Sequence, residues 1–488
     1  MAHPTDVIVV GAGASGGIVA CRLAERGRNV LLLEAGPDFP VDVPEILTTD
    51  LRVPVTEYDW GYRSEGDREI DLPRGRVVGG SSATNAVAAV RPQPADLDAL
   101  GIPEWTWDAC LDALSRFEDD AEYGRERYHG SDGPIHIERI DVEHSKPVTR
   151  AVFESFAEMF GVAMDQNAPR AHGAGPQASN TLDGARQSTL NTYIERARAL
   201  PTFALRAGAM VDRVHLQRGT ATGVVLATGE QIHAAEIIVA AGALATPGIL
   251  MRSGIGPAEH LREHGIAVVQ DLPVGENLHD HPAIGLMAIA RDPSQIDQRL
   301  HARIMARHSF EGRAGEEDIH VFGSFTGHGT RSPIPPEAFV VAGMLTKPRA
   351  RGWVRLRSAD PLDAPRVFLN FLGEPGDLDL FCRLLLTLEA SLDQRALKEV
   401  IDRVLWRPSS VDGDELERVA RAAALTDHHE AGTVPIGTCL DAHLRVFGVD
   451  GLRVCDASVL PDTPRANTNL PAMMIAERFV ELLDGERA

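Results

Sequence analysis

Three glycines near the amino end of the chain have a spacing that suits the binding of a dinucleotide phosphate. The segment Gly11-Ala-Gly-Ala-Ser-Gly16 follows an apolar run at 7–10 and opens a helical pattern. Gly11 allows a tight turn, Gly13 lets a pyrophosphate approach the backbone, and Gly16 lets the helix pack closely on the strand. The amino end of that helix then faces the phosphate charge. This motif does not choose between FAD and NAD.

An acidic residue strengthens this interpretation. Glu34 closes the second apolar strand, about 20 residues after the glycine turn. Its carboxylate can accept hydrogen bonds from the hydroxyls of an adenosine ribose, and it would repel a 2′-phosphate, which disfavours NADP. The alternative is a glycine-rich turn followed by an acid by chance.

The elements that must position these residues alternate between strand and helix at the amino end. The pattern predicts strands at 6–10 and 29–34 with a helix at 17–26 between them, which is a βαβ start. Further strands are predicted at 222–227 and 237–240, followed by a helix at 245–252. The end of the chain returns to this style, with a strand at 452–455 and a helix at 472–484.

The middle of the chain, from about 288 to 420, has a different pattern. Alternating segments such as Trp353-Val-Arg-Leu-Arg and Ala338-Phe-Val-Val-Ala predict an antiparallel sheet with one solvated face. The segment 376–397 is predicted to be a long helix. The nucleotide-binding part is therefore expected to come from both ends of the chain, with a second part inserted between them.

Length and charge limit the possible classes of protein. A chain of 488 residues is too long for one ordinary core. A formal net charge of −22 repels phosphate backbones and anionic membranes, so we do not expect this protein to bind nucleic acid. There is no basic leader segment and no apolar run of about 20 residues, so we expect a cytoplasmic protein without stable membrane insertion. The five cysteines show no metal-like spacing and are predicted to be free thiols: Cys21, Cys110, Cys382, Cys439 and Cys455.

Five segments in order along the chain resemble the glucose–methanol–choline (GMC) family of oxidoreductases. Arg74-Gly-Arg-Val-Val-Gly-Gly-Ser-Ser-Ala-Thr-Asn85 is similar to the first signature of the family. Gly242-Ala-Leu-Ala-Thr-Pro-Gly-Ile-Leu-Met-Arg-Ser-Gly-Ile-Gly256 matches the second. Further matching blocks are 274–281 (Val-Gly-Glu-Asn-Leu-His-Asp-His), 352–361 and 452–461.

The resemblance implies FAD as the cofactor. Gly79 and Gly80 make a backbone that can lie against a flat isoalloxazine ring, and Ser81 and Asn85 offer hydrogen bonds. Some members attach FAD covalently through a His just before the signature Asn; here that residue is Thr84, so we predict non-covalent FAD. The predicted cofactor contacts are Gly11, Gly13, Ala14, Ser15, Gly16, Glu34, Ala35, Gly79, Gly80, Ser81, Asn85, Ala86, Ala88, Val211 (through its backbone, to the adenine), Asp456 (near the ribityl or pyrophosphate), Asn467 and Thr468.

The resemblance also implies a catalytic pair. The segment His428-His429-Glu430-Ala-Gly-Thr433 aligns with the family pattern YHPVGT, which puts His429 at the position of the catalytic base. The family carries His or Asn at the position of Asn467, which would orient the substrate oxygen because an amide takes no proton at neutral pH. Asn469 is the rival in a shifted register. His428 and Glu430 depart from the family pattern and leave the pKa of the base open.

Several histidine and aromatic residues could have a purely structural role instead of a functional one. His279 and His281 flank Asp280, but metal sites need several convergent ligands with supporting hydrogen bonds, and the family pattern explains these two, so no metal is predicted. Trp105 and Trp107 are expected to be core or lid residues. An aromatic cluster in the loop before the first signature is expected either to cap the flavin or simply to pack: Tyr58, Trp60 and Tyr62.

Together these patterns predict an α/β protein of the GMC fold, with a Rossmann-like FAD-binding domain and an inserted substrate domain on an antiparallel sheet. The predicted limits are 1–145, 186–287 and 430–488 for the first domain, and 146–185 and 288–429 for the second. The predicted reaction is oxidation of an alcohol to an aldehyde or ketone, by proton abstraction and hydride transfer to flavin N5. Oxygen, a quinone or another carrier is the expected electron acceptor. The alternative is an FAD-dependent lyase or photodecarboxylase on the same fold.

Overall fold

A five-stranded parallel sheet holds the amino end, the middle and the carboxyl end of the chain together. The computed structural model describes residues 5–49, 57–66, 68–299, 303–311, 317–325, 335–411 and 413–486. The strand order is β10-β2-β1-β14-β25, which is the doubly wound order 3-2-1-4-5 when these strands are counted along the chain. The strands are β1 (Val7–Val10), β2 (Val30–Leu33), β10 (Phe203–Arg206), β14 (Glu236–Val239) and β25 (Leu452–Val454).

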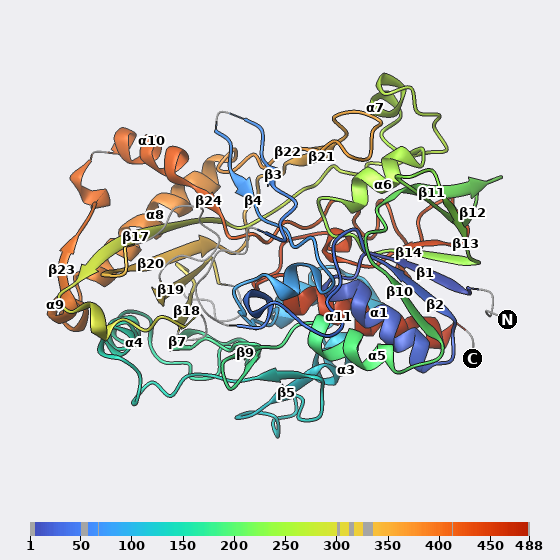
Figure 1. Ribbon diagram of the computed structural model, residues 1–488. Helices are drawn as coiled ribbons and strands as arrows, with labels where there is room; N and C mark the ends of the chain where they lie inside the picture. Colours follow the sequence, from blue (N-terminus) through green and yellow to red (C-terminus); the bar gives the residue numbers. More distant parts are fainter. Residues whose placement is uncertain are drawn as a thin grey trace.

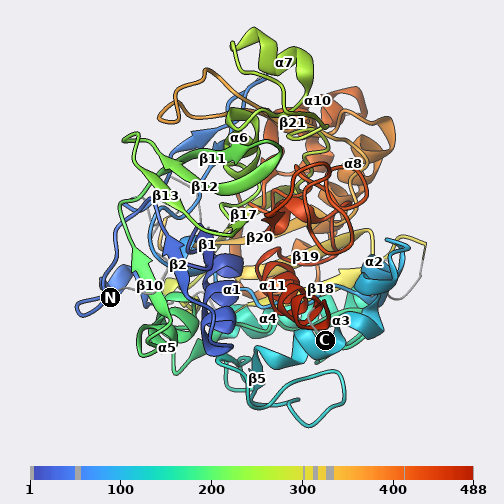
Figure 2. The same cartoon turned by 90° about the vertical axis from the view of Figure 1, so that its right-hand side faces the viewer.

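Both faces of this sheet are covered, which explains its continuous apolar strands. Helices α1 (Ala14–Glu25), α3 (Trp107–Arg116) and α11 (Asn469–Gly485) pack together on one side (Figure 2). A three-stranded sheet packs on the other side, with strands β11 (Val211–Gln217), β12 (Thr220–Leu226) and β13 (Gln231–His233). Trp105 and Trp107 are buried in this core. The strand order reverses between β1 and β14, and in doubly wound sheets ligands bind at that point.

The second sheet is antiparallel and lies at the other end of the molecule (Figure 1). Its order is β23-β17-β20-β19-β18-β7, and β24 also pairs with β17. The strands are β7 (Gly173–Pro176), β17 (Pro282–Ala290), β18 (Ile304–His308), β19 (Ile319–Phe325), β20 (Ala338–Leu345), β23 (Ile401–Val404) and β24 (Leu425–Thr426). Helices α4 (Pro147–Phe160), α8 (Pro375–Leu392), α9 (Arg395–Val400) and α10 (Gly413–Ala423) contribute to its hydrophobic core.

The expectation of one solvated face on this sheet is wrong. Side chains alternate along β19: Ile319 and Val321 join the core beneath α4 and α8, whereas His320 and Phe322 line an internal cavity. All of β20 is buried, and on its second face Met344 lines the same cavity.

Other differences from the predicted elements are local. The segment at Trp353 forms β21 (Trp353–Arg355), which among the described strands pairs with β22 (Arg366–Phe368) alone, in a separate small sheet. The helix predicted at 376–397 is divided between α8 and α9. Helix α1 begins at Ala14 rather than 17, because the glycine turn itself forms the first helical turn.

Short elements complete the described chain. They are α2 (Pro94–Asp98), α5 (Glu195–Arg198), α6 (Thr246–Arg252), α7 (Ala258–Glu263), β3 (Tyr62–Arg63), β4 (Asp71–Leu72), β5 (Glu118–Asp120), β6 (Ile135–Ile137), β8 (Thr181–Leu182), β9 (Ala185–Arg186), β15 (Ile255–Gly256) and β16 (Gln270–Asp271). The predicted α/β class, with a parallel and an antiparallel sheet, is confirmed, whereas the exact domain limits stay a prediction. All five cysteines are free. Within the described ranges, no helix has the length and apolar character needed to cross a membrane.

Candidate active site

The glycine turn after β1 is closed on two sides by backbone. Gly11 has a φ of +100°, and a Cβ added there would stand 2.5 Å from the carbonyl oxygen of Ala240. A Cβ on Gly16 would stand 1.9 Å from the carbonyl oxygen of Gly11. A Cβ on Gly13 would meet nothing nearer than the Cα of Gly80, at 3.9 Å. The packing of the protein itself therefore requires Gly11 and Gly16, whereas Gly13 keeps its backbone open toward the cavity.

Glu34 joins the glycine turn to the end of β2. Its Oε2 accepts the backbone N–H of Ala12 at 2.9 Å, and its Oε1 accepts the N–H of Gly36 at 2.8 Å. Burial raises the pKa of Glu34, and these backbone hydrogen bonds act against the rise. The residue predicted to bind a ribose thus also fixes the turn that would hold the phosphates.

The second glycine-rich segment lies directly against the first. The N–H of Gly79 donates to the carbonyl oxygen of Ala12 at 2.8 Å, and Gly79 has a φ of +99° that favours glycine. The Oδ1 atom of Asn85 accepts the N–H of Val87 at 3.0 Å and Nη1 of Arg186 at 2.7 Å. Hydrogen bonds within the protein therefore orient Asn85, and no ligand is needed for this.

One cavity of about 490 Å³ is lined both by these turns and by His429. Gly16 and Gly79 are the two predicted site residues that do not line it, because both are occupied in packing one backbone segment against another. The predicted residues that do line it are Gly11, Gly13, Ala14, Ser15, Glu34, Ala35, Gly80, Ser81, Asn85, Ala86, Ala88, Val211, His429, Asp456, Asn467 and Thr468, and they are joined by Tyr58, Trp60 and Tyr62.

Asp456 connects the carboxyl end of the chain to this cavity. Its Oδ2 accepts the N–H of Gly242 at 2.8 Å and the hydroxyl of Thr246 at 2.6 Å, while Oδ1 accepts the N–H of Ser458 at 2.8 Å. Helix α11 begins at Asn469, so its amino end and its partial positive charge also face the cavity. The cavity thus has the backbone donors and small residues that an extended, phosphate-bearing ligand needs.

His429 and Asn467 meet inside the same cavity. Asn467 Nδ2 lies 2.9 Å from His429 Nε2, although the two residues are far apart in the chain. Asn469, the rival in the shifted register, also lines the cavity, but its Nδ2 is buried without a hydrogen-bond partner. The geometry therefore supports the pairing of His429 with Asn467.

The imidazole of His429 is buried and kept neutral. Burial lowers its pKa well below the ordinary value, and the neighbouring His281, His428 and Arg74 act in the same direction. His428 has a left-handed φ of +65°, an unusual conformation for a histidine, and burial lowers its pKa to about 3. A neutral imidazole at this position can accept a proton near neutral pH.

Two acidic residues beside His429, Glu430 and Asp427, have different partners. The guanidinium of Arg74 forms an ion pair with Glu430, and both line the cavity beside His429. Burial lowers the pKa of Arg74 to about 10. Asp427 Oδ2 lies 3.5 Å from His429 Nδ1, and burial, with help from the charge on Asp280, raises the pKa of Asp427 to about 7.

Sequence reasoning missed several cavity residues. Asp427 had a signal, because it stands two residues before His429, and Arg74 opens the first signature. No local pattern marked the residues that the antiparallel sheet and the positions directly beside its strands contribute, since they reach the cavity only through strand pairing. They are Gln177, Arg303, Met305, His320, Phe322 and Met344.

The segment His279-Asp280-His281 holds the backbone around His429 in place through hydrogen bonds. Asp280 Oδ1 accepts the backbone N–H groups of His281 at 2.7 Å and of His429 at 2.9 Å, and its Oδ2 accepts the hydroxyl of Thr426. His279 Nε2 lies 3.3 Å from the carbonyl oxygen of Leu460. Hydrogen bonds within the protein thus account for the conformations of these three residues.

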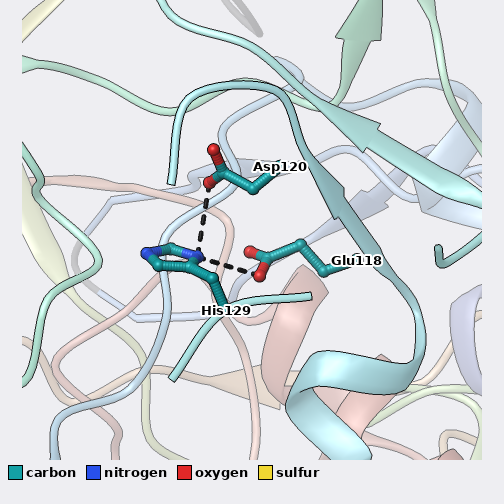
Figure 3. A group of neighbouring side chains, drawn as sticks. All are labelled: Glu118, Asp120 and His129. Atoms are coloured by element: carbon teal, nitrogen blue, oxygen red, sulfur yellow. Dashed lines mark hydrogen bonds and ion pairs between the residues drawn. The ribbon is translucent and has the colours of Figure 1, made fainter. Parts of the chain in front are cut away.

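A different cluster has the composition of a metal site. Glu118, Asp120 and His129 are buried and point toward one another, with His129 Nδ1 2.9 Å from Glu118 Oε2 and 3.3 Å from Asp120 Oδ2 (Figure 3). Glu118 also pairs with Arg91, and Asp120 forms two 2.9 Å hydrogen bonds with Arg139. These guanidinium groups already occupy the carboxylates that a metal ion would need.

The cluster is therefore a balanced charge network. His129 Nε2 lies 3.1 Å from Asp165 Oδ2, so three carboxylates face two guanidinium groups and one imidazole. Burial acts against the charged form of His129, but hydrogen bonds to Asp165 and Glu118 outweigh it and raise its pKa above the ordinary value. The network links β5 to the loop that follows it.

Replacing His129 with glutamine should destabilise the protein more at low pH than at high pH. A raised pKa stabilises the fold fully below the unfolded value of about 6.5, and that contribution is lost as pH rises through the folded pKa. We expect a loss of about 3 kcal/mol at pH 6, because a buried charge network is broken. Urea unfolding at pH 6 and pH 9 measures the difference. His136→Gln is the matched control, because His136 pairs with Asp119 at a partly exposed site; an equal loss at both pH values for His129→Gln would contradict the assignment.

Comparison with known proteins agrees with this geometry. Residues 5–283 match the amino-terminal family model and residues 348–476 the carboxyl-terminal family model, both described as GMC oxidoreductase. A 5-(hydroxymethyl)furfural oxidase of Methylovorus sp. (strain MP688) is 33% identical, over 98% of each chain. An oxygen-dependent choline dehydrogenase of Paraburkholderia phymatum is 31% identical, over 98% of this chain and 92% of the relative.

Solved structures show the same fold. Pyridoxine 4-oxidase from Mesorbium loti superimposes with a TM-score of 0.91 at 28% identity, covering 98% of this chain and 99% of the other. A fungal aryl-alcohol oxidase superimposes with a TM-score of 0.84 at 20% identity over the full length of both chains, which shows likeness of fold. Two family models that cover most of the sequence, and relatives matched from end to end, show that this chain belongs to the GMC oxidoreductase family of FAD-dependent enzymes.

Proposed function

We propose that this protein oxidises an alcohol to an aldehyde or ketone, with non-covalent FAD as its cofactor. The contact between His429 Nε2 and Asn467 Nδ2 carries the proposal, because it lies in the cavity that also contains both glycine turns. A proton acceptor and a hydrogen-bond donor at one point suit an alcohol oxygen, which must lose a proton while it is held in place.

The residues present fit FAD. Gly13 offers open backbone, and the amino ends of α1 and α11 face the same cavity. Thr84 lines the cavity at the position where a covalent link would require a histidine, so we propose that FAD is held by contacts alone. When bound, FAD supplies a two-electron acceptor for the hydride that leaves the alcohol carbon.

The side chains of the pair then have separate tasks. His429 Nε2 accepts the hydroxyl proton, and its lowered pKa keeps it ready to do so at neutral pH. The amide of Asn467 orients the alcohol oxygen beside that nitrogen. Because His429 is only 6% exposed, bulk water does not compete for its lone pair.

The names of the relatives support a substrate with a hydroxyl-bearing carbon. They are described as acting on 5-(hydroxymethyl)furfural, choline and pyridoxine. In this chain, the sheet-side wall combines the apolar Met305, Phe322 and Met344 with the polar Arg303 and Asp427. A cyclic substrate with polar substituents therefore suits this wall, and we propose oxygen or a quinone-type carrier as the electron acceptor.

Anaerobic mixing of the FAD-loaded enzyme with a panel of alcohols should bleach the flavin absorbance. The panel should contain 5-(hydroxymethyl)furfural, pyridoxine, choline, benzyl alcohol and a simple aliphatic alcohol. We expect at least one hydroxymethyl compound to reduce the flavin, and product analysis should show the corresponding aldehyde. Admission of oxygen then distinguishes an oxidase, which recovers its colour at once, from a dehydrogenase that needs an added quinone.

The same experiment includes the outcome that would contradict the proposal. If the flavin is bound but no alcohol in a broad panel reduces it, alcohol oxidation is wrong for this site. Light-driven loss of carbon dioxide from a carboxylic acid, or bond cleavage without net reduction of the flavin, would then favour the photodecarboxylase or the lyase. Release of the flavin by acid precipitation checks that it is non-covalent.

A further inference from the structure

His281 and His429 are brought together by a strand pairing. His281 immediately precedes β17, and β24 pairs with the start of that strand through Pro282 and Thr426. The chain then turns, and His429 Nδ1 lies 2.9 Å from His281 Nδ1. Asp280 accepts the backbone N–H groups of both histidines, so the distance between the two rings is set by the backbone.

The partners of His281 determine where its proton lies. His281 Nε2 stands 3.1 Å from the carbonyl oxygen of Thr346 and 3.0 Å from that of Pro464. Carbonyl oxygens only accept hydrogen bonds, so Nε2 carries a hydrogen and donates it. Burial lowers the pKa of His281 to about 4, and the ring is therefore neutral at neutral pH. Its Nδ1 atom is then left with a lone pair.

The tautomer of His429 follows from this. Between two ring nitrogens 2.9 Å apart one must donate, and the Nδ1 atom of His281 has no hydrogen to give. His429 must therefore be protonated on Nδ1, which leaves the lone pair on Nε2. That lone pair faces Asn467 Nδ2 at 2.9 Å, which is the point assigned to the alcohol oxygen.

We propose that His281 is a positioning residue that fixes the tautomer of His429, so that the basic nitrogen of the pair faces the substrate. For its catalytic consequence this inference rests on the proposed alcohol oxidation. His429 Nε2 takes the hydroxyl proton, the ring becomes an imidazolium, and its Nδ1–H continues to donate to His281. No proton needs to leave through His281.

Asp427 offers a second acceptor to the same hydrogen. Its Oδ2 lies 3.5 Å from His429 Nδ1, too far for a good hydrogen bond, and burial raises its pKa to about 7. It therefore gains its charge near neutral pH. The titratable and charged groups around His429 and Asp427 are Arg74, Asp280, His281, Arg303, His320, His428 and Glu430.

Two variants of the FAD-loaded enzyme separate an acceptor role from a merely structural one. His281→Asn places an amide oxygen near the former Nδ1 position, whereas His281→Leu removes the acceptor. We expect His281→Asn to keep the rate constant of flavin reduction within about fivefold of the wild type. His281→Leu should lose about 10²-fold at pH 6, because the wrong tautomer becomes accessible.

The pH profile supplies a readout that simple loss of packing would not change. Above pH 7 the ionised Asp427 can accept the Nδ1–H, so we expect His281→Leu to recover about tenfold. The double variant His281→Leu with Asp427→Asn should show no recovery. Equal rates for His281→Asn and His281→Leu would overturn the proposal.

A measurement without substrate keeps this inference separate from the proposed function. Nitrogen NMR of the oxidised holoenzyme, labelled with ¹⁵N in the histidine rings, reports which ring nitrogen carries hydrogen. The signals of His429 are those lost in His429→Asn. We expect a protonated Nδ1 and a bare Nε2 in the wild type, and a mixture in His281→Leu. A hydrogen on Nε2 in the wild type would overturn the proposal even if alcohols reduce the flavin, and the expected pattern would uphold it even if none does.

Discussion

Replacing His429 with asparagine should lower the rate constant of flavin reduction by an alcohol about 10³-fold, while FAD stays bound. The amide fills most of the same space and can still contact His281, but it cannot take a proton at neutral pH. Anaerobic stopped-flow absorbance measures the effect. Because burial holds the pKa of His429 well below its ordinary value, the wild-type rate should fall only in acid, and this acidic fall should disappear in the variant.

The adjacent histidine provides the matched control. His428 also lines the cavity, and asparagine tolerates its left-handed φ of +65°. We expect His428→Asn to stay within about tenfold of the wild-type rate, because its ring makes no contact with Asn467 that would support proton transfer. A His429→Asn enzyme that keeps more than about a tenth of the activity would mean that another group, with Asp427 the first candidate, is the base.

Replacing Gly13 with alanine should weaken FAD binding without unfolding the protein. The new Cβ would have no protein atom nearer than 3.9 Å, so the apoprotein has room for it. The same methyl group would stand where the pyrophosphate must approach the backbone, and we expect FAD affinity to fall about 10²-fold. The ratio of flavin to protein absorbance after gel filtration, and titration of the apoprotein with FAD, measure the loss.

Gly376 provides the matched control, because a Cβ there would have as much room as a Cβ on Gly13. A Cβ on Gly376, in the first turn of α8, would also meet its nearest atom at 3.9 Å, and this residue lies outside the cavity. Gly376→Ala should therefore bind FAD like the wild type. Gly16→Ala should fail to fold, since its Cβ would stand 1.9 Å from a backbone oxygen. Normal FAD affinity in Gly13→Ala would refute the assignment of the phosphate position.

The nucleotide-binding half of the fold was predictable because its signals are local. A strand, a glycine turn, a helix and an acid occur within the first 34 residues, and backbone sterics alone require Gly11 and Gly16. The α/β class followed from such patterns at both ends of the chain. The pairing of His429 with Asn467 needed the family resemblance, because nothing in the spacing of the two residues implies contact.

The other half depends on strand pairing, which leaves little local trace. The segment at 338–342 was predicted to be a strand of an antiparallel sheet, but its second face was expected to be solvated, because the sequence does not show which face of a strand meets a cavity. The role of His281 could not be predicted for the same reason. It depends on two carbonyl oxygens, of Thr346 and Pro464, that come from distant segments.

The strand order of the parallel sheet also determines the sequence of events while the chain is being made. Strand β14 pairs on one side with β1 and on the other with β25, which comes much later in the chain. Until residues 452–454 have left the ribosome, β14 is an unprotected edge, and Asp456 and Asn467 are absent from the cavity. All strands of the antiparallel sheet lie between 173 and 426 and are complete by then. The nascent chain can therefore assemble the sheet-side wall of the cavity before the parallel-sheet side of the cavity is complete.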